Sequence, residues 1–144
     1  AGLIRDETNL VGILANVSAA LHDAFPERFF WVGFYLQENG NMLRLGPFQG
    51  SVACYTIPYG KGVCGKAWEE GRTLIVPNVE TFPGHIACSS RSQSEIVIPM
   101  YDSQRHFRGV LDIDSTQFDD FSAEDKDGLE HIIQLLMAQI EDLF

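Results

Sequence analysis

The sequence is poor in basic residues. Its 144 residues include 10 Lys and Arg against 20 Asp and Glu, which gives a formal net charge of −10 and a pI of about 4.6. A surface with this balance repels a phosphate backbone and offers it no basic patch. We therefore expect neither nucleic acid nor an anionic membrane as a partner.

Long hydrophobic runs are also missing. No apolar stretch approaches the roughly 20 residues that span a bilayer, and the N-terminal segment lacks the basic-then-apolar profile of a signal peptide. We therefore expect a cytoplasmic protein. The hydrophobic content of 45% is sufficient for the core of one domain, and the composition does not shift along the chain. This predicts a single domain over residues 1–144.

Cysteine occurs only three times, at Cys54, Cys64 and Cys88. An odd number does not form a closed disulfide framework, and thiols in the cytosol are kept reduced. The spacings of ten and twenty-four residues lack the short pairs of a structural zinc site, and the four histidines are scattered. We therefore expect no metal site and look for another use of the thiols.

Two long helices are predicted at the ends of the chain. In residues 8–25 apolar residues recur at three- and four-residue steps, and Pro26 ends this helix. Near the C-terminus, Ser122 and Asp125 resemble a capping box, and the helical pattern after them continues to Leu143.

The middle of the chain predicts a sheet. The Asn39-Gly40 pair indicates a hairpin between the first two strands, and the polar residues 102–106 indicate another between the last two. The expected strands lie at 29–36, 42–48, 53–58, 73–76, 94–101 and 107–115, with a short helix at 65–70. The element order predicts an α+β fold in which a mostly antiparallel six-stranded sheet carries the N- and C-terminal helices. Residues 77–93 have no periodicity, and a loop of this length in a compact domain is usually functional or disordered.

Three carboxylates are predicted to converge on this sheet. Because side chains alternate along a strand, Asp112 and Asp114 share one face of the last strand. If the preceding turn is centred near residue 104, Glu95 lies across from about Asp114. Carboxylates this close share a proton or await a cation, which suits a receptor or enzyme for an amine-bearing ligand. The alternative is that they line a solvated face of the sheet.

The first strand places Trp31 and Tyr35 on one face, with Gly33 between them. This pattern is compatible with a binding slot that has an aromatic wall. It is equally compatible with two aromatic side chains that fill the core beneath a helix.

Cys88 stands in the long polar loop, which suits a reacting thiol. His85 and Arg91 are each three residues away and are of a type that lowers a thiol pKa. Taken singly, Cys54 and Cys64 are more often small buried hydrophobic residues than reactants.

These features together have a known counterpart. The chain resembles the free methionine-(R)-sulfoxide reductases, which are built on a GAF domain, from about Thr8 to the C-terminus. The resemblance rests on the cysteine spacings and on the segments Phe30-Trp31-Val32-Gly33-Phe34-Tyr35, Gly60 to Gly65, Gly84-His85-Ile86-Ala87-Cys88, Ser94 to Pro99 and Gly109 to Ser115.

The resemblance implies an enzyme that reduces the (R)-sulfoxide of free methionine, with thioredoxin as its reductant and with no metal or organic cofactor. It implies that Cys88 is the nucleophile, that Cys54 resolves its sulfenic acid through an intramolecular disulfide, and that Cys64 is an auxiliary or alternative cysteine. It places the substrate between the carboxylates and the aromatic wall, which comprise Glu95, Asp112, Asp114, Trp31 and Tyr35. It also allows for a homodimer.

Two other functions remain open at this point. A non-catalytic GAF module would bind a small amine or nucleotide in the same pocket and signal by a conformational change. A thiol redox sensor would need the reactive cysteines but would have no use for the acidic and aromatic residues.

Overall fold

The computed structural model describes residues 2–86 and 88–144. A six-stranded sheet with the strand order β3-β2-β1-β6-β5-β4 forms its centre, and each pair of neighbouring strands in it is antiparallel. The elements are α1 (Leu10–Ala24), β1 (Trp31–Glu38), β2 (Met42–Gln49), β3 (Thr56–Pro58), α2 (Gly62–Glu70), β4 (Leu74–Val76), η1 (Val79–Thr81), β5 (Ser94–Tyr101), β6 (Phe107–Ser115), α3 (Ala123–Ile140) and η2 (Glu141–Leu143). The α+β architecture with terminal helices on an antiparallel sheet is thus confirmed.

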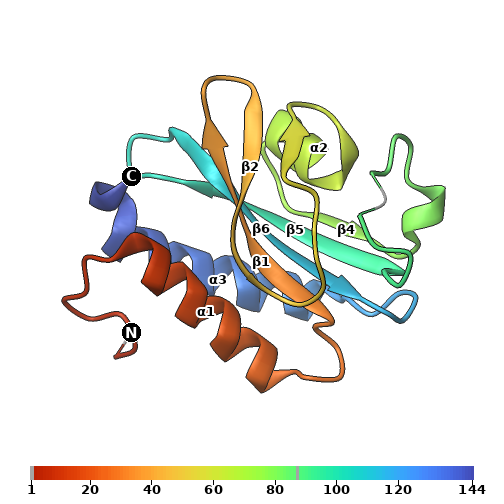
Figure 1. Cartoon of the computed structure of the whole chain (residues 1–144), viewed down its shortest axis with the longest axis horizontal. Coiled ribbons are helices and arrows are strands. Elements are labelled where there is room, and N and C mark those ends of the chain that lie inside the picture. The colour runs from red at the N-terminus through yellow and green to blue at the C-terminus, as the bar shows by residue number, and fades with distance from the viewer. Residues whose placement is uncertain (1, 87) are drawn as a thin grey trace.

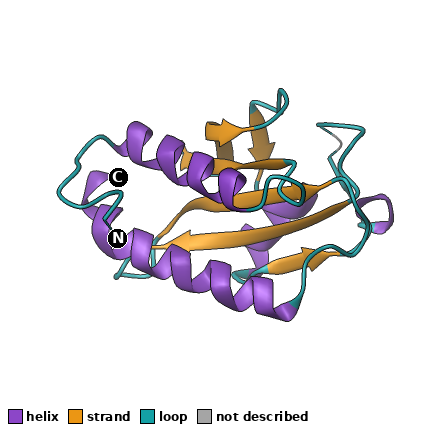
Figure 2. Ribbon diagram, turned by 90° about the horizontal axis from the view of Figure 1, so that it is seen from below, coloured by secondary structure: helices purple, strands orange, loops and turns teal. Residues whose placement is uncertain are grey.

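The helices cover the two faces of the sheet (Figures 1 and 2). One hydrophobic cluster joins α1 and α3 to side chains such as Val32, Ile96 and Leu111. A second cluster on the other face joins α2 to Trp31, Tyr35 and their neighbours. In the described part of the chain, no helix combines the length and the apolar character needed to cross a membrane.

Local signals set several element ends. Asn9 caps α1 by accepting a hydrogen bond from the Gly12 amide at 3.1 Å. Ser122 and Asp125 form the expected capping box at the start of α3. Asn39 and Gly40 both adopt positive φ, 49° and 84°, which is the conformation that a tight hairpin requires.

Of the boundaries that differ from those expected, three concern residues near the cysteines and the aromatic strand. The first strand begins at Trp31 instead of Phe29, because a helical turn after α1 holds the Phe29 amide on the Phe25 carbonyl at 2.9 Å. The third strand begins only at Thr56, so residues 53–55 belong to a loop. Helix α2 begins at Gly62 and not at Gly65, which places Cys64 in its first turn.

Candidate active site

Two neighbouring strands carry the three carboxylates. In the β5–β6 hairpin Glu95 pairs with Asp114, as its register predicted, and Val97 pairs with Asp112. Glu95 and Asp112 are each 6% exposed, and Asp114 is partly buried. The sheet face that carries them is therefore not a solvated one.

Burial and mutual repulsion perturb these groups. Burial, reinforced by the charges of Asp112 and Asp114, raises the pKa of Glu95 well above its usual range. Burial and the neighbouring Asp112 likewise raise the pKa of Asp114 well above its usual range. Burial also raises the pKa of Asp112, although hydrogen bonding with Glu95 and Cys64 partly offsets this. At neutral pH such a cluster retains protons or attracts a cation.

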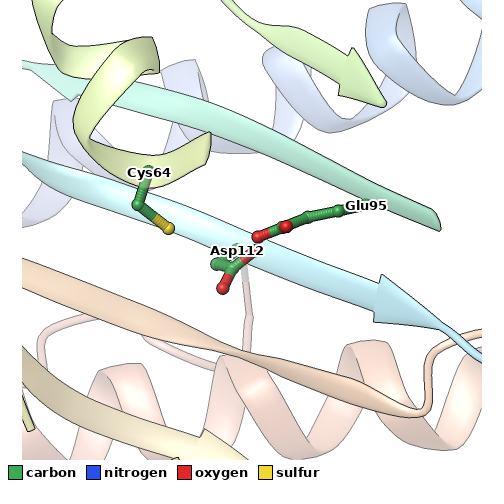
Figure 3. A group of neighbouring side chains, drawn as sticks. All are labelled: Cys64, Glu95 and Asp112. Carbon is green, nitrogen blue, oxygen red and sulfur yellow. The ribbon is translucent and has the colours of Figure 1, made fainter. Parts of the chain in front are cut away.

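Cys64 joins the three carboxylates from helix α2, which packs over this face of the sheet. Helix α2 brings its side chain, 3% exposed, over β5 and β6, where it points toward the carboxylates (Figure 3). Burial, followed by the charges of Asp112 and Glu95, raises the pKa of the Cys64 thiol well above its usual range. The thiol therefore remains protonated and is a poor nucleophile in this environment.

One buried oxygen of the cluster lacks a hydrogen bond. Within residues 2–86 and 88–144, Oδ1 of Asp112 is one of two buried side-chain atoms, with Oγ of Ser51, that have no such partner. A buried acceptor without a donor is costly and uncommon in native proteins. A ligand that carries N–H groups would satisfy it.

The Cys64 thiol and the carboxylates of Glu95 and Asp112 are close enough to share a metal ion. Cys64 Sγ and one carboxylate oxygen each from Glu95 and Asp112 lie within 4.8 Å of one another. The sequence predicted no metal site because short ligand spacings reveal only ligands that are close along the chain, and these three residues are far apart in it. Metal binding would require all three groups to lose their protons, and burial raises the pKa of each. An ammonium group needs only one ionised carboxylate, so the cluster suits an organic cation better.

An aromatic wall stands beside the carboxylates. Strand β1 pairs with β6 so that Trp31 lies opposite Asp114, and the Trp31 and Tyr35 rings stack with centroids 6.0 Å apart. Both residues belong to the hydrophobic cluster under α2 and also line the cavity described below. The two side chains therefore both fill the core beneath a helix and form an aromatic wall of the cavity. Gly33 is required between the rings, because a Cβ at this position would collide with Phe48.

A disulfide joins Cys54 to Cys88 across 34 residues, with their Cα atoms 5.4 Å apart. It links the loop between β2 and β3 to the long loop that precedes β5, and both cysteines are half-buried. Cys64 is the remaining free cysteine and is buried. Cys54 and Cys88 are thus joined in a disulfide, whereas Cys64 keeps its thiol and lies beside the buried carboxylates.

These groups surround one cavity. Seven of the eight predicted site residues line it, namely Trp31, Tyr35, Cys64, Cys88, Glu95, Asp112 and Asp114. Cys54 does not line it and is connected to it through the disulfide. With the disulfide formed, the cavity measures only about 40 Å³, whereas pockets for small molecules usually hold about 300 Å³ or more. A cavity of this volume is too small for an amino-acid ligand.

The chain is similar to several known proteins along most of its length. A family model described as GAF domain matches residues 9–141. GAF domain-containing protein A of Dictyostelium discoideum is 54% identical over 135 residues, which are 94% of this chain and 84% of that protein. The free methionine-R-sulfoxide reductase of Escherichia coli is 44% identical over 139 residues, 96% of this chain and 80% of that protein. The free methionine-R-sulfoxide reductase of Neisseria meningitidis, solved by X-ray crystallography in complex with its substrate, is 45% identical, with a TM-score of 0.92 and coverage of 97% of this chain and 83% of that one. The chain belongs to the free methionine-R-sulfoxide reductase family.

Membership in the free methionine-R-sulfoxide reductase family confirms the resemblance found in the sequence motifs. The structure adds wall residues that those motifs did not assign to the site, above all Phe30, Val52, Ile86 and Ser92. Residues outside helices and strands carry no periodic signal, so only their position around the cavity identifies them.

The two charged neighbours expected to assist Cys88 are arranged differently. His85 lines the cavity, but burial lowers its pKa, so it is a weak source of positive charge at neutral pH. The Arg91 guanidinium lies over the Phe30 ring, with its carbon 4.4 Å from the ring centroid. Arg91 therefore supports an aromatic residue of the cavity wall.

Proposed function

We propose that this protein reduces free methionine (R)-sulfoxide to methionine, with Cys88 as the nucleophile. The observation that carries the proposal is the position of Cys88, which lines a cavity with buried carboxylates and is also bonded to Cys54. A thiol that can form a disulfide thus stands beside groups that can hold an amine and deliver a proton.

The reaction can be written so that atoms and electrons balance. Cys88 attacks the sulfoxide sulfur, and a carboxyl group protonates the sulfoxide oxygen as the S–O bond breaks. The oxygen leaves as water after a second proton transfer, and water then attacks the Cys88 sulfur and breaks the new bond between the two sulfurs. This releases methionine and leaves a sulfenic acid on Cys88, so the sulfoxide sulfur is reduced and Cys88 is oxidised. The Cys54 thiol then condenses with the sulfenic acid, which releases water and forms the disulfide. An external dithiol restores both thiols.

Glu95 is our candidate for the proton donor. Among the three carboxyl groups it is strongly buried and has charged neighbours on both Asp112 and Asp114, and these factors raise its pKa well above the usual range. A carboxyl group in this condition can hold a proton at neutral pH and donate it. Asp112 and Asp114 are then available to the substrate ammonium, and Oδ1 of Asp112 offers an acceptor without a donor.

The site also accounts for selectivity. Trp31 and Tyr35 would receive the methyl group, while the chiral sulfur must present its lone pair to Cys88 and its oxygen to the acid. One epimer alone meets both conditions. A peptide bond removes the ammonium charge that the carboxylates would bind, so protein-bound methionine sulfoxide is a poor substrate.

A racemic mixture of free methionine sulfoxide, supplied with thioredoxin, thioredoxin reductase and NADPH, tests the proposal. We expect consumption of the (R) epimer only, with no turnover of a peptide that contains methionine sulfoxide. Equal turnover of both epimers or of the peptide would contradict the proposed selectivity. Tight binding of an amine without any turnover would favour the non-catalytic GAF module instead.

The two other cysteines are predicted to respond differently to substitution. Cys54→Ser should still release about one equivalent of methionine per protein in a single turnover, but it should lose steady-state turnover with thioredoxin, because no disulfide forms. Cys64→Ser should retain steady-state turnover within about tenfold, because this buried thiol lies outside the disulfide. Methionine release in single-turnover and steady-state assays measures both responses, and thiol counting after one turnover shows whether a disulfide has formed. A disulfide between Cys64 and Cys88 in the parent protein would overturn the assignment of Cys54.

Thioredoxin, a cytoplasmic location and a homodimer complete the proposal. A recycled disulfide suits a compartment that supplies reduced dithiol proteins. For the homodimer, an apolar groove of about 250 Å³ between α1 and α3 is lined by Val17, Ala20, Ile132 and Leu135. Leu135 in this groove is 51% exposed, and a second copy of the chain could cover it. The molar mass of the protein in solution decides between monomer and dimer.

A further inference from the structure

The loop that carries Cys54 exposes two large apolar side chains beside it. Val52 is 86% exposed and Tyr55 is 78% exposed, and they are the two most exposed large hydrophobic residues of the described chain. They flank Cys54 at distances of two residues and one residue in the sequence. Exposed apolar groups that gather at one place often mark a protein contact.

Their exposure does not come from a loosely held loop. The Trp31 indole donates to the Ser51 carbonyl at 3.0 Å, and the Tyr35 hydroxyl donates to the Cys54 carbonyl at 2.9 Å. The Leu45 amide donates to the Tyr55 carbonyl at 2.9 Å. The backbone is therefore held on both sides of Cys54, while Val52 and Tyr55 present their side chains to solvent.

The loop is also uncharged in a strongly acidic protein. Residues 45–60 contain no Asp, Glu, Lys or Arg, although 21% of the chain is charged. A partner that contacts this segment meets no formal charge from it. Binding there would depend on apolar contact and respond weakly to salt.

The Cys54–Cys88 disulfide indicates that a partner at this loop is a reductant. The sulfur of Cys88 belongs to the cavity, which is lined by Cys88 and not by Cys54. The exposed side chains of Val52 and Tyr55 lie within two residues of Cys54, and Val52 also lines the cavity, so a protein reductant that contacts them is placed beside Cys54. Reduction by two electrons with release of both thiols calls for a dithiol.

We propose that Val52, Cys54 and Tyr55 form the docking surface for a dithiol protein reductant, which attacks Sγ of Cys54. The inference rests on the proposed function, since it concerns the recycling of the same disulfide. One thiolate of the reductant forms a mixed disulfide with Cys54, and the Cys54–Cys88 bond breaks with Cys88 leaving as a thiolate. The second thiol of the reductant then attacks the mixed disulfide, which oxidises the reductant and leaves Cys54 reduced. Cys88 is thus freed for the next substrate in the first step.

The test compares a protein reductant with a small one. In the variant Tyr55→Ser, we expect the KM for thioredoxin to rise about fivefold or more, with turnover supported by dithiothreitol unchanged, because Tyr55 is exposed and does not line the cavity. Tyr55→Phe should behave as the parent, because it keeps the apolar ring. Val11→Ser is the matched control, since Val11 is 67% exposed on α1, whose partners lie in the other hydrophobic cluster.

A second measurement locates the attacked sulfur. Thioredoxin that lacks its second active-site cysteine should be trapped on Cys54, as peptide mapping of the mixed disulfide would reveal. Trapping on Cys88, or an unchanged KM for thioredoxin in Tyr55→Ser, overturns the inference. Absence of turnover by the parent with dithiothreitol would instead contradict the proposed function, so the two failures are distinguishable.

Discussion

Cys88→Ser is expected to abolish turnover of free methionine (R)-sulfoxide, with a fall in kcat of about 10⁴-fold or more, as for the loss of other catalytic nucleophiles. A serine hydroxyl is not appreciably ionised at neutral pH and does not attack the sulfoxide sulfur as a thiolate does. Release of methionine in steady-state and single-turnover assays measures the effect. The variant should lose both, whereas Cys54→Ser should lose only the first.

Binding and stability measurements separate chemistry from folding in this variant. Serine is close in size to cysteine, and the carboxylates are untouched, so Cys88→Ser should bind methionine sulfoxide with an affinity within about tenfold of the reduced parent, allowing for the lost sulfur contacts. Titration calorimetry tests this. The variant should also unfold at the same temperature as the reduced parent, because neither has the disulfide. Single-turnover activity in a folded Cys88→Ser protein would exclude Cys88 as the nucleophile.

Glu95→Gln is expected to lower kcat by about 10²- to 10³-fold, the usual contribution of a general acid. At the same time the variant should be more stable than the parent at neutral pH. Glutamine retains the shape of the side chain but cannot ionise, so it removes the cost of keeping Glu95 protonated beside Asp112 and Asp114 at neutral pH. Activity and stability are thus expected to change in opposite directions, as at other sites where function opposes stability.

The pH dependence of this stability difference follows from the direction of the pKa shift. In the folded protein the pKa of Glu95 is raised well above the ordinary value of 4.5. Folding therefore favours the protonated form, and the parent loses stability as pH rises above about 4.5 toward the folded-state pKa. Each unit of separation between the two pKa values corresponds to about 1.4 kcal/mol. The variant lacks this loss, so its advantage in the free energy of unfolding should grow as pH rises above about 4.5 and level off once pH passes the folded-state pKa of Glu95.

Thermal or urea unfolding at several pH values tests this prediction. Glu27→Gln is the control, since Glu27 is exposed and remote in sequence from the cluster. It should change neither kcat nor the pH profile of stability. An advantage of Glu95→Gln that shrinks with rising pH would mean that Glu95 is ionised and stabilised in the folded protein.

The β5–β6 hairpin shows how far local patterns reach. A five-residue polar turn between two apolar runs limits the register, and alternation along each strand then determines which side chains share a face. The pairing of Glu95 with Asp114 and the common face of Asp112 and Asp114 could be derived in this way. The capped terminal helices were equally accessible, because their periodicity and caps are local properties.

The loop around Cys54 shows where such patterns stop. Residues 53–58 read as a continuous strand, yet only Thr56–Pro58 pair with β2. The preceding residues follow other partners, since Tyr35 binds the Cys54 carbonyl and Cys88 binds its sulfur. These partners are 19 and 34 residues away, and no local preference encodes them.

The sequence by itself therefore determined the fold class, the family and the acidic face of one hairpin, because these follow from short-range periodicity, turn chemistry and motif. Only the tertiary structure decided which cysteine joins which group. It brings Cys64 from α2 among the carboxylates, bonds Cys54 to Cys88, and closes the cavity between them. The physical reason is that burial, pKa and disulfide formation depend on distances between elements, which loop closure and packing set.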